Sequence, residues 1–147
     1  MKTDIEKQMD VERIFHHTWQ MYMGAMELGL LPNPFKLLPQ GIKKPQIVCI
    51  CKGVNYAGRY FTRGNLVQIN TAYYDGVNDK ELKQTIAHEI AHHLQWVLVP
   101  GFKQWHGPEF RQIMEAIGYE ANTYHDMSPM KAASRAKKVK DELFDLG

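Results

Sequence analysis

The feature that most constrains this chain is an H-E-x-x-H motif within residues 85–93, which read Thr-Ile-Ala-His-Glu-Ile-Ala-His-His. His88 and His92 are four positions apart, so on a helix they project from the same face and can reach one metal ion. Glu89 lies about 100° around the helix axis from His88, where it can hold a water on that metal and accept its proton. The motif therefore predicts a helix that carries a metal-dependent hydrolytic site.

The residues around the motif indicate that this helix is buried on two sides. An apolar stripe with helical spacing runs opposite the two histidines, formed by Leu82, Ile86, Ile90, Leu94 and Val97. The histidine side also carries apolar or neutral residues, namely Thr85, Ala91, Gln95 and Trp96. Such a face is too apolar for ordinary contact with solvent, so we expect protein on both sides. Asn78, with Glu81 three residues later, predicts a capping box at the start of the helix.

A zinc site also needs a third protein ligand and an open fourth position for water. The metzincin pattern would place Gly at position 95 and His at position 98, where this chain has Gln95 and Leu98, so that class is excluded. His106 is a better candidate, because Pro108 marks the first turn of a following helix and would hold His106 at its entrance. The buried face of that following helix is predicted to be Phe110, Ile113, Met114 and Ile117, and the helix is predicted to end at Gly118.

Other acidic and imidazole side chains are weaker candidates for the third ligand. Glu109 and Glu115 are the next candidates if His106 is not the third ligand. His93 directly follows His92 and therefore projects from a different part of the helix, which predicts that it is not a ligand. His16 and His17 are predicted to be solvent-exposed.

The motifs HEIAHH and HGPEF, separated by a short connection, resemble the SprT-like zinc metallopeptidases, a family that includes proteases of DNA–protein crosslinks. The resemblance covers about residues 10–120, with its specific motifs at 88–92 and 106–110. It implies a zincin-like metalloprotease domain in which His88, His92 and His106 bind Zn²⁺ and Glu89 is the catalytic residue. Many members carry a Cys-rich zinc ribbon or a long DNA-binding tail, and this sequence shows neither, so proteolysis is more strongly expected than DNA dependence.

The pattern along the chain predicts an α+β fold. A long amphipathic helix is expected over residues 11–29, and strands over 47–51, 57–62 and 66–70 are expected to form a small antiparallel or mixed sheet. The 147 residues suit one core. We assign residues 1–127 to a metallopeptidase domain and residues 128–147 to a basic amphipathic helix packed on it, beginning at Ser128 and Pro129. His125 and Asp126 precede that helix and are candidates to support the metal ligands or to contact substrate, although nothing in the sequence places them near the metal.

Cysteine content and the N-terminal sequence favour an intracellular protein. Cys49 and Cys51 are the only cysteines and are two apart in a predicted strand, too far along it for an easy disulfide. We interpret them as small, buried apolar side chains rather than as half of a metal site. The first residues have no apolar signal core, so the predicted location is the cytoplasm.

Charge is unevenly distributed, although the net charge is only +2. No acidic residue occurs between Leu28 and Tyr74, whereas six basic residues do: Lys36, Lys43, Lys44, Lys52, Arg59 and Arg63. This basic segment suits a nucleic-acid backbone or an acidic substrate, but it is equally explained as charge that keeps a sheet edge soluble. A protein substrate is expected to lie extended against an edge strand, near residues 66–70.

Three functions remain open at this point. The first is a zinc endopeptidase that acts on DNA-bound or DNA-crosslinked proteins. The second is a cytoplasmic or phage processing protease without a nucleic-acid role. The third is a non-catalytic, zinc-stabilised binding domain whose fourth coordination position is closed by the protein.

Overall fold

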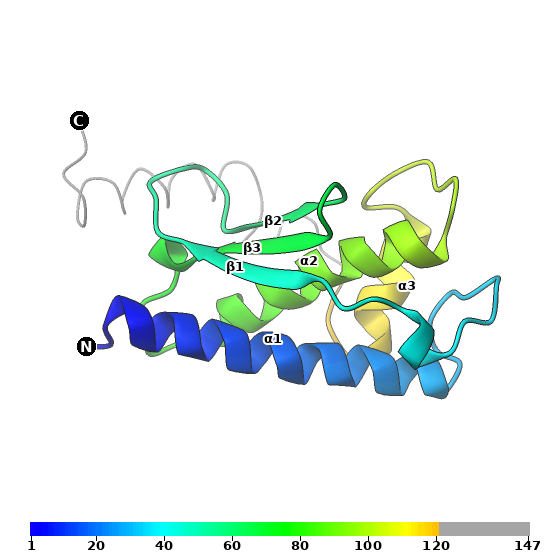
Figure 1. Cartoon of the computed structure of the whole chain (residues 1–147), viewed down its shortest axis with the longest axis horizontal. Helices are drawn as coiled ribbons and strands as arrows, with labels where there is room; N and C mark the ends of the chain where they lie inside the picture. The colour runs from blue at the N-terminus through cyan, green and yellow to red at the C-terminus, as the bar shows by residue number, and fades with distance from the viewer. Residues whose placement is uncertain (121–147) are drawn as a thin grey trace.

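The computed structural model describes residues 1–120. It contains α1 (Asp4–Glu27), β1 (Gln46–Ile50), β2 (Gly58–Phe61), β3 (Leu66–Asn70), α2 (Lys80–Leu98) and α3 (Pro108–Ala116). Two short 3₁₀ helices, η1 (Pro39–Gly41) and η2 (Thr71–Tyr73), lie in the connections. The sheet covers α1 and α2, and α3 packs near the far end of α2 (Figure 1). The predicted α+β fold is confirmed, whereas residues 121–147, including His125, Asp126 and the predicted terminal helix, lie outside the described residues.

The sheet is mixed, which was one of the two predicted arrangements. Its strand order is β1-β3-β2, with β1 parallel to β3 and β2 antiparallel to β3. Val67 and Ile69 of β3 are buried, while Gln68 between them faces the other side and is only half-buried. β3 is paired on both sides, so the prediction that residues 66–70 form a free edge for substrate is wrong. The strand that lies at the edge and packs on α2 is β2.

The first helix begins seven residues earlier than the apolar pattern predicted. Thr3 forms a capping box with Glu6: the Thr3 hydroxyl accepts from the Glu6 N–H at 3.1 Å, and the Glu6 carboxylate accepts from the Thr3 N–H at 3.1 Å. These first turns are largely exposed and polar, so apolar periodicity does not report them. The face predicted for this helix is buried, comprising Val11, Ile14, Phe15, Thr18, Tyr22, Ala25 and Met26.

α2 is covered on both sides, as predicted. Four of the five residues of the apolar stripe are buried, and Val97 is half-buried. On the histidine side Thr85, Ala91 and Gln95 are buried, and only Trp96 remains half exposed, at 50%. The capping box predicted at its start is wrong: Asp79 is the N-cap without a side-chain cap, and the Asn78 side chain accepts from the Lys80 N–H at 3.1 Å.

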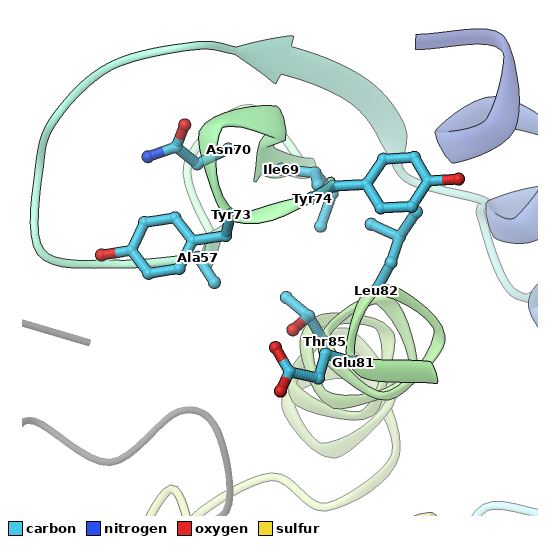
Figure 2. Close-up of a pocket in the computed structure, with 8 residues that line it drawn as sticks. All are labelled: Ala57, Ile69, Asn70, Tyr73, Tyr74, Glu81, Leu82 and Thr85. Carbon is cyan, nitrogen blue, oxygen red and sulfur yellow. The ribbon is translucent and has the colours of Figure 1, made fainter. Parts of the chain in front are cut away.

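The end of β3 is held by Asn70, beside a small pocket between the sheet and the start of α2 (Figure 2). The Asn70 side chain donates to the Lys52 carbonyl at 2.8 Å and accepts from the Ala72 N–H at 3.1 Å. The pocket has room for about one water molecule. Its Thr85 lies on α2 one turn before Glu89, so the strand end and the metal-motif helix share one packed junction.

The two cysteines do not form a disulfide. Cys49 and Cys51 are free and half-buried, and Cys49 packs against the core, where burial raises the pKa of its thiol to about 11. Within residues 1–120, none of the helices combines the length and apolar composition needed to cross a bilayer.

Candidate metal centre

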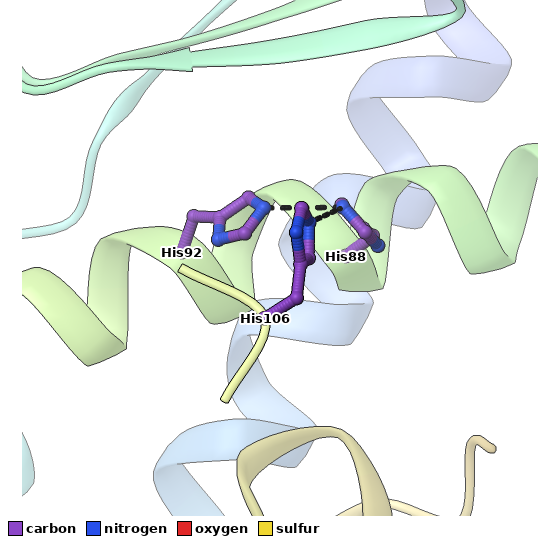
Figure 3. A group of neighbouring side chains, drawn as sticks. All are labelled: His88, His92 and His106. Carbon is purple, nitrogen blue, oxygen red and sulfur yellow. Dashed lines mark hydrogen bonds between the residues drawn. The ribbon is translucent and has the colours of Figure 1, made fainter. Parts of the chain in front are cut away.

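Three histidines converge on one point beside the middle of α2. His88 and His92 come from successive turns of α2, and His106 comes from the loop between α2 and α3 (Figure 3). The His92 Nε2 and His88 Nε2 atoms are 3.1 Å apart, and the His106 Nε2 and His88 Nε2 atoms are 3.3 Å apart. One ring nitrogen from each residue lies within 4.8 Å of the others. The fold thus brings together all three residues predicted as metal ligands.

Burial of His92 and His106 favours the neutral imidazole, the form that binds metal ions. Burial lowers the pKa of His92 to about 3, with a further contribution from His106, and burial also lowers the pKa of His106. Tetrahedral zinc with Zn–N bonds of about 2.0–2.1 Å needs ligand nitrogens about 3.3 Å apart. The two short Nε2–Nε2 distances are close to that value, so the residues present fit Zn²⁺.

The fourth coordination position is not filled by another side chain of the described residues. In residues 1–120 the group contains His88, His92 and His106, and no further His, Cys, Asp or Glu belongs to it. Glu109 and Glu115, the alternative third ligands, are therefore outside the cluster. A three-nitrogen site with an open position has the composition of a catalytic rather than a structural zinc site.

The loop that carries His106 is held by the turn into α3. Gly107 is the N-cap of α3 and its N–H donates to the Gln104 carbonyl at 3.2 Å, and Pro108 follows in the first turn, as predicted. Phe110, fully buried in the first turn of α3, contacts all three imidazole rings at centroid distances of 4.7–5.1 Å. The sequence marked Phe110 only as a core residue; its place behind the metal cluster follows from the packing of α3 on α2.

Aromatic side chains also line the outer side of the cluster. Trp105 contacts the His92 ring edge-on at 5.3 Å and is stacked with Trp96 at 5.9 Å. Phe102 packs against Trp105 at 4.6 Å. Trp96 and Trp105 are 50% and 39% exposed, so an apolar surface adjoins the histidines. Sequence reasoning did not single out Trp105, although its position directly before His106 was a usable signal.

Glu89 is a residue of α2, and its side chain is packed against β2. Its side chain is 3% exposed, and burial raises the pKa of its carboxyl to about 8, while the charge of Arg59 acts in the opposite direction. A cation held by the neighbouring imidazoles would also favour the carboxylate form. Gly58 at the start of β2 lies directly against this residue, a contact that the sequence did not reveal.

The remaining histidines are used elsewhere. One His93 ring nitrogen, Nε2, lies 2.8 Å from the Lys43 carbonyl, and the other, Nδ1, lies 2.9 Å from the Tyr60 hydroxyl. Burial lowers the pKa of His93 to about 4, so the neutral ring links α2 to β2 and to the segment before β1. His16 and His17 are exposed on α1, as predicted, and His16 contacts Lys44.

The six predicted DNA-contacting residues are divided between different parts of the fold, and Lys36 lies in the connection between α1 and η1. Lys43, Lys44 and Arg63 lie at the end where β1 and β3 begin, whereas Lys52 follows the opposite end of β1. Lys44 packs over the Phe15 ring, and burial lowers its pKa. Arg59, on β2, lies 4.6 Å from the centroid of the Tyr56 ring. Lys36, Lys43, Lys52, Arg59 and Arg63 are exposed.

The fold and the site define an α+β domain with a helix-borne H-E-x-x-H motif and a third histidine that completes a possible metal centre. Residues 40–129 match the model of the SprT-like family, which covers more than half of the chain. The chain therefore belongs to the SprT-like family, and its three-histidine group is compatible with a metalloprotease. α1 precedes the matched region.

Relatives carry the same family name. The chain is 28% identical to Protein SprT-like of Geobacillus sp. (strain WCH70) over 82 residues, which are 56% of this chain and 51% of that protein. It is 33% identical to Protein SprT of Pseudomonas fluorescens (strain SBW25) over 78 residues, 53% of this chain and 47% of that protein. The chain thus spans about half the length of these relatives. No solved structure matches it significantly.

Proposed function

We propose that this chain is a zinc-dependent endopeptidase with a zincin-like site, in which His88, His92 and His106 hold the metal. The observation that carries the proposal is the convergence of three imidazoles: the Nε2 atoms of His92 and His106 lie 3.1 Å and 3.3 Å from the His88 Nε2 atom, with no fourth ligand among the described residues. Membership of the SprT-like family supports the same conclusion.

The chemistry divides between the metal and Glu89. When bound, Zn²⁺ would act as a Lewis acid that polarises the scissile carbonyl and acidifies water. Glu89 is the group that accepts the proton of the attacking water and then donates it to the leaving amine. Its burial against Gly58 of β2 keeps the carboxyl away from bulk solvent and restricts its position. Phe110 packs against the imidazoles from the inner side and Trp105 contacts His92 from the outer side.

The substrate is proposed to be an extended polypeptide bound along the free edge of β2. This strand lies at the edge of the sheet and packs on α2, whereas β1, the other edge, packs on α1. A peptide there can form main-chain hydrogen bonds with the strand and so pass over Glu89. We further propose that the substrate is bound to DNA. Five exposed basic residues support this, and one of them, Arg59, acts electrostatically on Glu89.

The test is cleavage of a DNA-binding protein by the zinc-loaded chain, with and without DNA, with Glu89→Gln as the blank. Cleavage that requires DNA and disappears in Glu89→Gln is expected. Equal cleavage with and without DNA would support the peptidase activity and exclude a requirement for DNA. A zinc-loaded, folded chain that cleaves no unfolded or DNA-bound protein would contradict the proposal and favour a zinc-stabilised binding domain.

A further inference from the structure

Gln95 is a fully buried polar residue on α2, three positions after His92. Its Nε2 atom donates to the Gln104 carbonyl at 2.9 Å. The same carbonyl accepts from the Gly107 N–H at 3.2 Å and so closes the turn that contains His106. The Gln95 side chain therefore anchors the loop of the third histidine to the helix of the first two.

The other half of this carboxamide lacks a partner. The Gln95 Oε1 atom and the His92 Nδ1 atom are both buried, and neither has a hydrogen-bond partner among residues 1–120. Because a carbonyl oxygen can only accept, the carboxamide atom 2.9 Å from the Gln104 oxygen must be the amide nitrogen of Gln95, and Oε1 must face the other way. Gln95 follows His92 by three positions on α2, so the two side chains are neighbours on the helix surface and their two unpartnered atoms can face each other.

The tautomer of His92 connects these two atoms. Its Nε2 faces the Nε2 of His88 at 3.1 Å, so Nε2 is the nitrogen available to a metal. A neutral imidazole that uses the Nε2 lone pair carries its proton on Nδ1 and needs an acceptor there. A histidine that binds a metal generally donates its other N–H in this way, and that bond fixes the orientation of the ring.

We propose that Gln95 is a positioning residue that couples two ligands of the metal site. Its Oε1 accepts from the His92 Nδ1–H, and its Nε2 holds the Gln104 carbonyl and with it His106. One carboxamide thus fixes the ring of a helix-borne ligand and the loop of a distant one. The inference rests on the metal site of the proposed function, but it does not depend on peptidase activity.

The test compares three variants of the full chain by zinc affinity, measured in competition with a chelator. Gln95→Met keeps the approximate volume and removes both interactions. Gln95→Glu keeps an acceptor for His92 and removes the donor to Gln104. Gln104→Ala is the matched control, because Gln104 contributes only its main-chain carbonyl and its side chain is exposed. The second readout is the NMR signal of the His92 Nδ1–H in the zinc-loaded protein.

Gln95→Met is expected to weaken zinc binding about 10–100-fold and to lose the protected Nδ1–H signal. Gln95→Glu is expected to retain that signal, and Gln104→Ala to bind zinc within about twofold of the unmodified chain, since neither change removes the acceptor or the carbonyl. A Gln95→Met variant that is less stable but binds zinc normally would show a purely structural role and overturn the proposal. If Gln95→Met does not fold, loss of the Nδ1–H signal in Gln95→Glu overturns it instead.

Discussion

Gly58 of β2 lies so close to Glu89 of α2 that a methyl group at position 58 would be 3.0 Å from the Glu89 Cγ atom and 2.8 Å from the Thr85 Cγ2 atom. The strand can approach the helix this closely only where it has no side chain. This contact presses β2 onto the carboxylate that we propose as the catalytic base, so the edge strand and the proposed base are positioned together.

Gly58→Ala is therefore expected to displace Glu89 and to destabilise the fold by about 1–3 kcal/mol, as overpacking does in a close-packed interior. Cleavage should fall while zinc stoichiometry stays at one, because the histidines do not contact position 58. Thermal unfolding, zinc content and turnover measure the three effects. Gly41→Ala is the control, since among the described residues no atom beyond the adjacent backbone lies within 4 Å of its added methyl group. Full turnover in Gly58→Ala would contradict the role of this contact.

His106→Ala is expected to weaken zinc binding by at least the 10–100-fold seen when a supporting group is removed, because one of three ligands is lost. The measurement is chelator competition on the folded variant, with circular dichroism to verify the fold. His17→Ala, a change at an exposed histidine of α1, should leave zinc affinity unchanged. Stoichiometric, tight zinc in His106→Ala would assign the third ligand to another residue.

Tyr60→Phe should lower the free energy of unfolding by about 1–3 kcal/mol, since it leaves the buried His93 Nδ1 without a partner. Zinc affinity should be unchanged, because His93 supports the packing of α2 on β2 and lies outside the metal cluster. Urea unfolding of the metal-free protein measures the first quantity and chelator competition the second. A large loss of zinc affinity with unchanged stability would show that His93 supports the metal site and not the packing of α2 on β2.

The stability of the metal-free protein should fall at acid pH partly through Asp10. Its carboxylate accepts from Lys2 at 2.5 Å and from the Tyr74 hydroxyl at 2.7 Å, and these bonds hold its pKa below the ordinary value. A lowered folded-state pKa contributes stability above the unfolded pKa, about 3.9, and this contribution is lost as the pH falls through the folded pKa.

Asp10→Asn should therefore be less stable than the unmodified chain at pH 6, and the difference should shrink steadily below about pH 4. Denaturant unfolding at several pH values in the presence of a chelator measures it without interference from the metal. Glu12→Gln, at an exposed position of α1, is the control for the removal of one negative charge from this helix. A stability difference that is independent of pH would show that the Asp10 interactions are not those of the charged form.

Local spacing in the sequence determined the helices, the site candidates and the approximate strands. Residues three and four apart share a helix face, so the burial of α2 on both sides and the common face of His88 and His92 could be predicted without a structure. The entrance of α3 was predictable for the same reason, because Pro108 acts within one turn. The polar first turns of α1 and the N-terminus of α2 were not predicted correctly, since capping depends on the geometry of individual side chains.

Only the tertiary structure decided which distant segments meet. β3 pairs directly with β1, although β2 lies between them in the sequence. This pairing places residues 66–70 in the centre of the sheet and β2 at the edge beside α2. The sequence contains no signal for that order, because strand pairing joins residues far apart in the chain. The contacts of Gly58 with Glu89, of Gln95 with the Gln104 carbonyl and of Phe110 with the three imidazoles arise in the same way, when separate elements pack against α2.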